Sequence, residues 1–494
     1  ALIVVATGLP EADTFWSPYY RVRLYRFSPP EGWPRPAAYH VDVNHDYHQR
    51  IVDLSPAFLA RHPEAEPNRS ALATYELPYH IVAETGEVLV VGAGTGNDVA
   101  AALRHGATRV DAVEIDRVII ELGRRYHPER PYDSPRVTVT VDDARAFFKR
   151  TDRKYDLIVF GYLDAHTLIS SYSSLRLDNY VYTRESFEEA RSLLKKDGTL
   201  IVAFNSGTSF VTDRLFAALA RAFGTPPRAY YTGYDYAGVV MIEGRGRDAA
   251  PPREFPEISD QLRSRLDATL VTTDRWPFLY LAGRTIPAPI LSVLALFLCG
   301  SFVLLRRTLN LPRLASRENL HFFFLGAGFL LLETRGITEL SLLFGSTWIV
   351  NAVVIGAFLA MGILANTLVM YRPVARRTAY VPLFVLIGLG MFFPLTHLDL
   401  LPASAKVLAA GIFVGLPVFF SGLVFSRSFR DVADPAQALG VNLLGCVVGG
   451  TLENTVMLAG TPVLGGLAVL LYALSAVYAI LRRNGLQETP SAIA

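Results

Sequence analysis

The pattern of apolar and polar positions divides the chain, which is 494 residues long, at about residue 285. Before that point, short apolar runs alternate with polar and helix-like stretches. Beyond it, residues 286–483 form a succession of long apolar runs separated by short loops. Runs of this length are typical of helices that cross a bilayer. We therefore expect a soluble α/β region followed by an all-α, multi-pass transmembrane bundle.

In the soluble region, four apolar stretches that end in turns predict the parallel strands of a doubly wound sheet, namely 88–91, 109–115, 136–141 and 155–160. Further strands are expected at 199–204, 228–231 and 238–242, and helices at 69–83, 97–106, 185–194 and 210–223. Aromatic and β-branched residues between 14 and 54 predict a small antiparallel β-unit. The expected domains are 1–67 (β-unit), 68–250 (sheet domain), 251–285 (linker), 286–483 (about seven helices) and 484–494 (tail).

A glycine-rich turn lies between the first of these strands and its helix. The sequence VLVVGAGTG runs from Val88 to Gly96, and its glycines permit a tight turn in which backbone N–H groups approach a ligand closely. Glu114 ends the next strand, about twenty residues on, where a carboxylate can accept from both ribose hydroxyls. The combination predicts a nucleoside site in an S-adenosylmethionine-transferase-like sheet. The alternative is a purely structural glycine turn.

Two other groups of polar residues follow strands of the predicted sheet. Asp142, Asp143 and Ala144 follow the third strand, where Asp143 either reads the base or acts as the N-cap of the next helix. A polar loop, 162–183, follows the fourth strand and is longer than such connections usually are. Loops in this position lie over the carboxyl ends of the strands, where ligands bind.

The stretch from Phe15 to about Glu243 resembles the spermidine synthases, which are polyamine aminopropyltransferases, and especially their membrane-fused bacterial relatives. The motifs that carry the resemblance are WSPYY at 16–20, HQ at 48–49, VLVVGAGTG at 88–96, VEID at 113–116, DAR at 143–145 and KYDLIV at 154–159. The resemblance implies S-adenosylmethionine or decarboxylated S-adenosylmethionine as co-substrate and a small-molecule amine, such as a polyamine, as acceptor.

The resemblance also implies roles for individual residues. The turn Gly92, Ala93, Gly94, Thr95 and Gly96 would wrap the sulfur-side chain of the nucleoside. Glu114 would hold the ribose, while Asp143, between Asp142 and Ala144, would accept from the adenine amino group. Gln49 would line the substrate end of the site.

Two departures from the family bear on catalysis. Thr95 stands where the family has an aspartate in the glycine turn, and Gly161 stands where the family has the aspartate thought to deprotonate the attacking amine. A cationic amine needs nearby anions to bind and to lose its proton. Asp164 is the candidate base, assisted by Tyr162, His166 or Asp178, the last of these on the substrate side. The alternatives are a loop-capping Asp164 and a solvated loop histidine at 166.

Seven spans are expected in the second half: 286–305, 321–344, 348–370, 379–395, 405–425, 438–458 and 463–481. Arginines cluster in every second loop and after the last span, and they are Arg306, Arg307, Arg313, Arg317, Arg372, Arg376, Arg377, Arg427, Arg430, Arg482 and Arg483. This positive-inside pattern predicts a multi-pass protein of the cell membrane with a cytoplasmic C-terminus. An odd number of spans would put the soluble domain outside, whereas S-adenosyl nucleosides are cytosolic, so its side stays open.

Ionisable residues occur within two of the expected spans. Arg335 and Glu339 are four residues apart and share a helix face, while Glu333 points nearly the opposite way. Glu453 lies in the sixth span among small residues that allow close helix packing. Intramembrane charges usually face a bundle interior. We expect Glu333 and Glu453 either to line a cavity for a cationic or polar substrate or to belong to an interhelical hydrogen-bond network.

Composition bears on which ligands and partners the chain can have. Lys+Arg 47 against Asp+Glu 45 shows no nucleic-acid footprint in the totals, and the two cysteines, Cys299 and Cys446, offer neither a disulfide framework nor a metal-binding spacing. Residues 1–8 are apolar and are either the end of an upstream span or a strand. Partners expected are a small-molecule amine or a lipid-associated acceptor, membrane lipids and a second copy of the chain.

Three functions fit these features. The first is a membrane-bound, spermidine synthase-like aminopropyltransferase with divergent catalytic carboxylates. The second is an S-adenosylmethionine-dependent methyltransferase that acts on a membrane-associated acceptor, because the same nucleoside site would serve it and methyl transfer needs little beyond alignment. The third is a non-enzymatic module for ligand binding or transport.

Overall fold

The computed structural model describes residues 12–26, 38–63, 66–82, 85–163, 180–233, 238–249, 255–306, 309–345, 347–372, 374–393, 395, 398 and 401–487. The chain forms two compact units, Ala1–Ala282 and Gly283–Ala494. Each is described by itself below.

The first unit begins with a four-stranded antiparallel sheet in the order β1-β2-β3-β4. Its strands are β1 (Ala12–Trp16), β2 (Arg21–Arg26), β3 (Ala38–Val43) and β4 (Asp46–Val52). Val22 and Leu24 alternate with half-buried residues along β2, so one face of this sheet is apolar. That face packs on Ile119 and Leu122 of α4 (Arg117–Tyr126). The small antiparallel β-unit expected from the sequence is confirmed.

The main sheet has seven strands in the order β10-β11-β9-β8-β5-β6-β7. The strands are β5 (Glu87–Val91), β6 (Arg109–Glu114), β7 (Val137–Val141), β8 (Tyr155–Phe160), β9 (Leu194–Asn205), β10 (Arg228–Tyr231) and β11 (Gly238–Gly244). The five strands from β9 to β7 are parallel, whereas β11 and β10 are antiparallel additions. The predicted doubly wound sheet is therefore confirmed, with a mixed edge.

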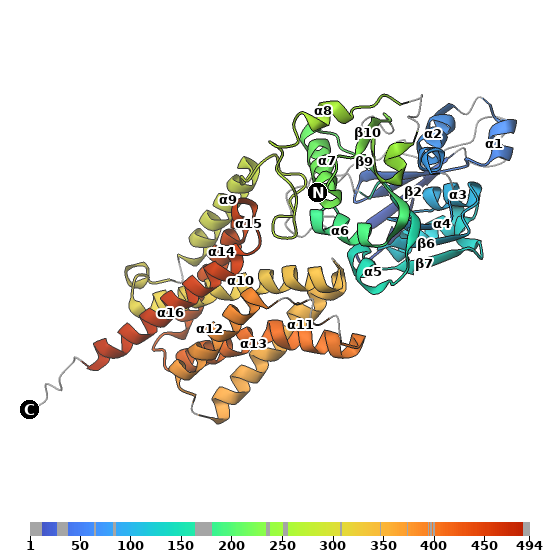
Figure 1. The fold of residues 1–494 in the computed structure, drawn as a ribbon. Coiled ribbons are helices and arrows are strands. Elements are labelled where there is room, and N and C mark those ends of the chain that lie inside the picture. The colour runs from blue at the N-terminus through green and yellow to red at the C-terminus, as the bar shows by residue number, and fades with distance from the viewer. Residues whose placement is uncertain are drawn as a thin grey trace, which may run out of the picture. The chain divides into compact units, whose positions relative to one another are not determined.

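Helices cover both faces of this sheet (Figure 1). Along β5, Leu89 and Val91 face one core and Val88 and Val90 face the other, because successive residues of a strand point to opposite faces. The first core includes α5 (Ala144–Arg150), α6 (Arg184–Ser192) and α7 (Ser209–Phe223), and the second includes α2 (Glu66–Ile81) and α3 (Asn97–Arg104). Short helices complete the unit: α1 (Pro56–Arg61), α8 (Ser259–Arg263), η1 (Pro131–Asp133) and η4 (Arg245–Asp248).

One boundary differs from the sequence expectation. Helix α6 ends at Ser192 and β9 already begins at Leu194, whereas we expected the helix to reach 194 and the strand to begin at 199. The early start of β9 arises because Leu194 pairs with Tyr155 across an irregularity in the ladder. Lys195 then forms ion pairs with Asp156 and Glu87.

The second unit consists of helices that match the seven expected spans. They are α9 (Ala288–Leu305), α10 (Arg317–Phe344), α11 (Trp348–Tyr371), α12 (Arg376–Phe392), α13 (Ala403–Arg430), α14 (Pro435–Leu452) and α16 (Val463–Gln487), with η5 (Leu311–Arg313), η7 (Glu453–Thr455) and α15 (Val456–Ala459) between them. Six of the described helical stretches are long and apolar enough to cross a membrane, and the stretch within α12 is shorter. The predicted multi-helix apolar region is thus confirmed.

Small residues set the closest helix contacts of the second unit. A Cβ built on Gly445 of α14 would lie 2.0 Å from the carbonyl oxygen of Phe323 in α10, and one on Gly449 would lie 2.4 Å from that of Ala327. The backbones of α10 and α14 are in contact because glycine has no side chain to separate them. Small residues allow the same close approach in other pairs of membrane helices. Asn442 adds an amide hydrogen bond to the carbonyl of Phe322 at 2.9 Å.

We expect Gly445→Ala to destabilise the bundle, because the new methyl group would collide with backbone that cannot rotate away. Such overpacking costs about 1–3 kcal/mol. The measurement is the thermal unfolding midpoint of the full chain in detergent. Gly356→Ala in α11 is the matched control, since a Cβ there meets nothing within 4 Å. Equal midpoints for the two variants would contradict the close α10–α14 contact.

Candidate functional site

The glycine turn after β5 has the backbone conformation that its sequence predicts. Gly92, Gly94 and Gly96 have φ angles of 72°, 54° and 108°, a region that residues with a Cβ rarely adopt. Space is also restricted, because a Cβ on Gly92 would lie 1.8 Å from Cδ2 of Leu163 and one on Gly94 would lie 2.6 Å from Nε2 of Gln49. The turn leads directly into α3, so its amides converge at a helix N-terminus.

The carboxylate of Glu114, at the end of β6, is hydrogen-bonded to this turn. The Gly94 N–H donates to Oε2 at 2.9 Å, and the Asp116 N–H donates to Oε1 at 3.0 Å. Burial raises the pKa of Glu114, and the two amide hydrogen bonds partly oppose that rise. An ionised carboxylate has about four lone-pair sites, so Glu114 retains capacity for a further donor such as a ribose hydroxyl.

Residues from other elements fix the outer side of the turn. Gln49 of β4 accepts from the N–H of Thr95 at 3.2 Å and from its hydroxyl at 2.9 Å. The Tyr132 hydroxyl donates to the carbonyl of Gly94 at 2.6 Å, and Asn97 donates to the carbonyl of Arg50 at 2.7 Å. Gln49 therefore lies beside the turn, and the fully buried Thr95 donates its hydrogen bonds to Gln49.

The acidic pair after β7 has local structural roles. Oδ1 of Asp143 accepts from the N–H groups of Arg145 and Ala146 at 2.9 and 3.1 Å, so Asp143 is the N-cap of α5. Asp142 accepts from the Asp143 N–H and forms an ion pair with Arg150. The capping alternative is present, and the adenine contact remains a prediction.

The expected catalytic loop is only partly described. Asp164, His166 and Asp178 lie outside the described residues, whereas Tyr162 is half-buried just after β8. The structure adds a carboxylate that the sequence analysis did not select. Oδ2 of Asp98, in the first turn of α3, lies 3.0 Å from the position of a Cβ built on Gly161, at the end of β8.

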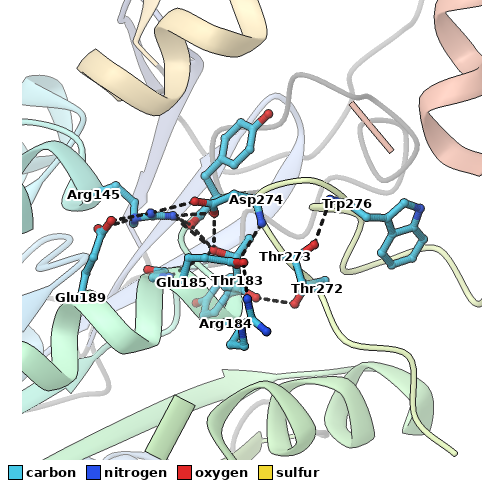
Figure 2. A network of polar contacts seen from close by, with 12 residues as sticks. Arg145, Thr183, Arg184, Glu185, Glu189, Thr272, Thr273, Asp274 and Trp276 are labelled. Carbon is cyan, nitrogen blue, oxygen red and sulfur yellow. Dashed lines mark hydrogen bonds and ion pairs between the residues drawn. The ribbon is translucent and has the colours of Figure 1, made fainter. Parts of the chain in front are cut away.

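A second polar network, which the sequence did not predict, surrounds Arg145 (Figure 2). This buried guanidinium donates to Glu189 of α6 at 2.7 Å and to Asp274 at 2.9 Å. Thr183 also donates to Asp274, at 2.7 Å. Burial alone would lower the pKa of Arg145, but the bonds to Glu189 and Asp274 outweigh it and raise that pKa. The network ties α5 and α6 to the stretch around Asp274.

The expected intramembrane residues make contacts inside the helical unit. Arg335 donates to Oε1 of Glu339 at 2.6 Å, as their four-residue spacing predicts. Thr334 of α10 donates to Oε2 of Glu453 in η7 at 2.7 Å, which is an interhelical hydrogen bond. Glu333 of α10 is half-buried. These contacts match the network alternative, and a polar cavity at Glu333 remains a prediction.

Part of the chain is similar to known proteins. Residues 72–223 match the family model of the spermine/spermidine synthase domain. A polyamine aminopropyltransferase of Pyrobaculum calidifontis is 34% identical over 131 residues, which cover 25% of this chain and 42% of that protein. Polyamine aminopropyltransferase 2 of Pseudomonas aeruginosa is 26% identical over 227 residues, which cover 44% of this chain and 59% of that protein. The crystal structure of spermidine synthase from Thermotoga maritima aligns at a TM-score of 0.35 and 17% identity, over 49% of this chain and 75% of that one.

The glycine turn, the acidic residue at the end of β6 and the strand order define a Rossmann-type class of domain. Within that class, residues 72–223 are a spermidine synthase-like domain, because the family model and the curated relatives both match there. The chain spans about two fifths of the length of the polyamine aminopropyltransferases of Pyrobaculum calidifontis, Korarchaeum cryptofilum and Clostridium perfringens that it matches.

We expect Arg145→Met to lower the free energy of unfolding by about 3–5 kcal/mol, because it leaves the partly buried Glu189 and Asp274 without their cation. Arg145→Met with Asp274→Asn should recover part of the loss. Chemical denaturation of the full chain in detergent measures both variants. Arg263→Met is the control, since its ion pair with Asp260 is exposed and worth under about 1 kcal/mol. A loss equal to that of the control would show that the network contributes little.

Proposed function

We propose that this protein transfers an aminopropyl group from decarboxylated S-adenosylmethionine to an amine acceptor. The observation that carries the proposal is the Glu114 carboxylate, bound to the Gly94 amide at the carboxyl edge of the sheet within the matched domain. A carboxylate in this place accepts from ribose hydroxyls. The turn from Gly92 to Gly96 would then hold the sulfur-side chain of the donor.

In this reaction the acceptor nitrogen attacks the carbon next to the sulfonium, and the carbon–sulfur bond breaks with its electron pair left on sulfur. The protein contributes orientation, because two reactants held in line lose much of the entropic barrier. Gln49, which lies next to the turn, would line the acceptor side. Asp164, Tyr162, His166 and Asp178 are the further candidates from the sequence.

We also propose that the second unit embeds the protein in the cell membrane. The support is the set of six long apolar helices, together with arginines in every second loop. The pattern puts the C-terminus in the cytoplasm. The domain boundaries proposed put the spermidine synthase-like domain at 68–250 and the bundle at 286–483, while the stretch 251–285, expected to be a linker, contributes Leu262 and Leu279 to the core of the first unit.

We expect the full chain in detergent to bind decarboxylated S-adenosylmethionine and methylthioadenosine more tightly than S-adenosylmethionine, as measured by calorimetric titration. Glu114→Gln should weaken binding of all three by about 10-fold or more, because the amide accepts from the ribose at only one atom and without charge. Glu121→Gln on α4 is the matched control, since Glu121 is exposed.

Three other results of this titration would contradict parts of the proposed function. Tighter binding of S-adenosylmethionine would contradict aminopropyl transfer and favour methyl transfer. Equal losses in Glu114→Gln and Glu121→Gln would contradict a ribose contact at Glu114. Absence of binding by any of the three nucleosides would remove both transferase functions.

The membrane topology is tested by thiol labelling of single-cysteine variants in a background without Cys299 and Cys446. Ala433→Cys lies in an arginine-flanked loop and should be labelled only from the cytoplasmic side. Thr461→Cys lies in a loop without arginine or lysine and should be labelled only from the opposite side. Labelling of both residues from one side would contradict the proposed topology.

A further inference from the structure

The strand order locates a crevice at the carboxyl edge of the sheet. From β5 the chain proceeds outward to β6 and β7, and it then returns to β8 on the other side of β5. In open α/β sheets, ligands bind at such a reversal, beyond the carboxyl ends of the two strands. Gly92 directly follows β5, Gly161 directly follows β8, and the Gly161 N–H donates to the carbonyl of Val91 at 3.0 Å.

The side chain of Asp98 reaches this reversal point from α3. A Cβ built on Gly161 would lie 3.0 Å from Oδ2 of Asp98 and 3.1 Å from the carbonyl oxygen of Gly92. The carboxylate of Asp98 therefore lies next to the place where a side chain at position 161 would begin. Gly161 contributes no side chain at this point, and Asp98 is half-buried beside it.

The other described carboxylates at this edge already have partners. Glu114 accepts from Gly94 and Asp116 N–H groups, Asp116 and Asp143 cap helices, and Asp142 pairs with Arg150. In contrast, no other residue of the described chain donates a hydrogen bond to the Asp98 carboxylate or forms an ion pair with it. Apart from the bond from its own backbone amide, the Asp98 carboxylate can therefore accept from a ligand.

The surroundings of Asp98 suit proton transfer near neutral pH. Burial raises the pKa of Asp98 to about 7, and its own backbone amide and Arg104 partly oppose the rise. Tyr79 of α2 and Tyr132 of η1 are the other titratable groups that interact with it, and burial raises the pKa of both phenols, so they stay neutral. A base whose pKa lies near the working pH is the most effective.

We propose that Asp98 is the catalytic base of the transfer and that its carboxylate binds the ammonium group of the amine acceptor. This inference rests on the proposed function. The ammonium gives one proton to the Asp98 carboxylate and becomes a neutral amine. The amine nitrogen then attacks the carbon next to the sulfonium, the carbon–sulfur bond breaks, and sulfur keeps the electron pair as a neutral thioether. The product nitrogen carries the positive charge.

This role also accounts for the glycine at the end of β8. The resemblance to spermidine synthases calls for a carboxylate at position 161, and the structure supplies one from the neighbouring helix instead. A hydroxyl or thiol acceptor would not need an anion for binding. An amine needs one both for binding its charge and for accepting its proton.

The test uses the full chain in detergent with decarboxylated S-adenosylmethionine and 1,4-diaminobutane. Asp98→Asn should lower kcat by about 100-fold or more while the affinity for methylthioadenosine stays within about twofold. The acid limb of the kcat/KM profile of the unmodified protein, near pH 7, should be absent in the variant. Asp152→Asn, at an exposed aspartate, is the matched control and should retain full activity.

A second variant separates loss of the base from loss of the fold. Asp98→Ala combined with Gly161→Asp moves the carboxylate to the other side of the same space, and it should recover at least about 10-fold of the activity that Asp98→Ala loses. Activity of Asp98→Asn equal to that of Asp152→Asn would overturn the assignment while leaving the proposed function in place. Absence of transfer by the unmodified protein to any amine would overturn both.

Discussion

The hydrogen bond from the Gly94 amide to the Glu114 carboxylate connects the parts of the candidate site. It joins the turn after β5 to the end of β6, and it requires a backbone at Gly94 that only glycine adopts easily. The same turn receives Gln49 from the small sheet and the Tyr132 hydroxyl from η1. If this turn changed shape, the carboxylate of Glu114, the side chain of Gln49 and the start of α3, which carries Asp98, would all move.

Apolar periodicity predicts the fold well because it reports burial directly. The run 88–91 is buried on both faces of the sheet, and the long apolar runs beyond residue 285 all appear as helices. Boundaries are less accessible from sequence, as at Leu194, whose strand pairing depends on Tyr155 across the sheet. Similarly, residues such as Leu262 and Leu279, within the stretch read as a linker, belong to the core of the first unit.

Site residues could be predicted from the sequence where a neighbouring strand or turn fixes their position. Gly92 and Gly94 follow β5 and Glu114 ends β6, so their positions at the carboxyl edge could be inferred from spacing. Asp98 and Arg145 could not be assigned in this way, because their surroundings come from segments distant in sequence, namely Gly161 for one and Asp274 for the other. A hydrophilic residue in the first turn of a helix is ordinary, and only its proximity to β8 makes Asp98 a candidate.

The central claim is that a nucleoside lies across the ends of β5 and β6 with its sugar at Glu114. A structure of the full chain bound to methylthioadenosine tests it most directly. We predict that both ribose hydroxyls lie within about 3.2 Å of the Glu114 carboxylate oxygens, with the thioether sulfur beside the turn from Gly92 to Gly96. A nucleoside bound elsewhere, or a ribose beyond hydrogen-bonding distance of Glu114, would contradict the account.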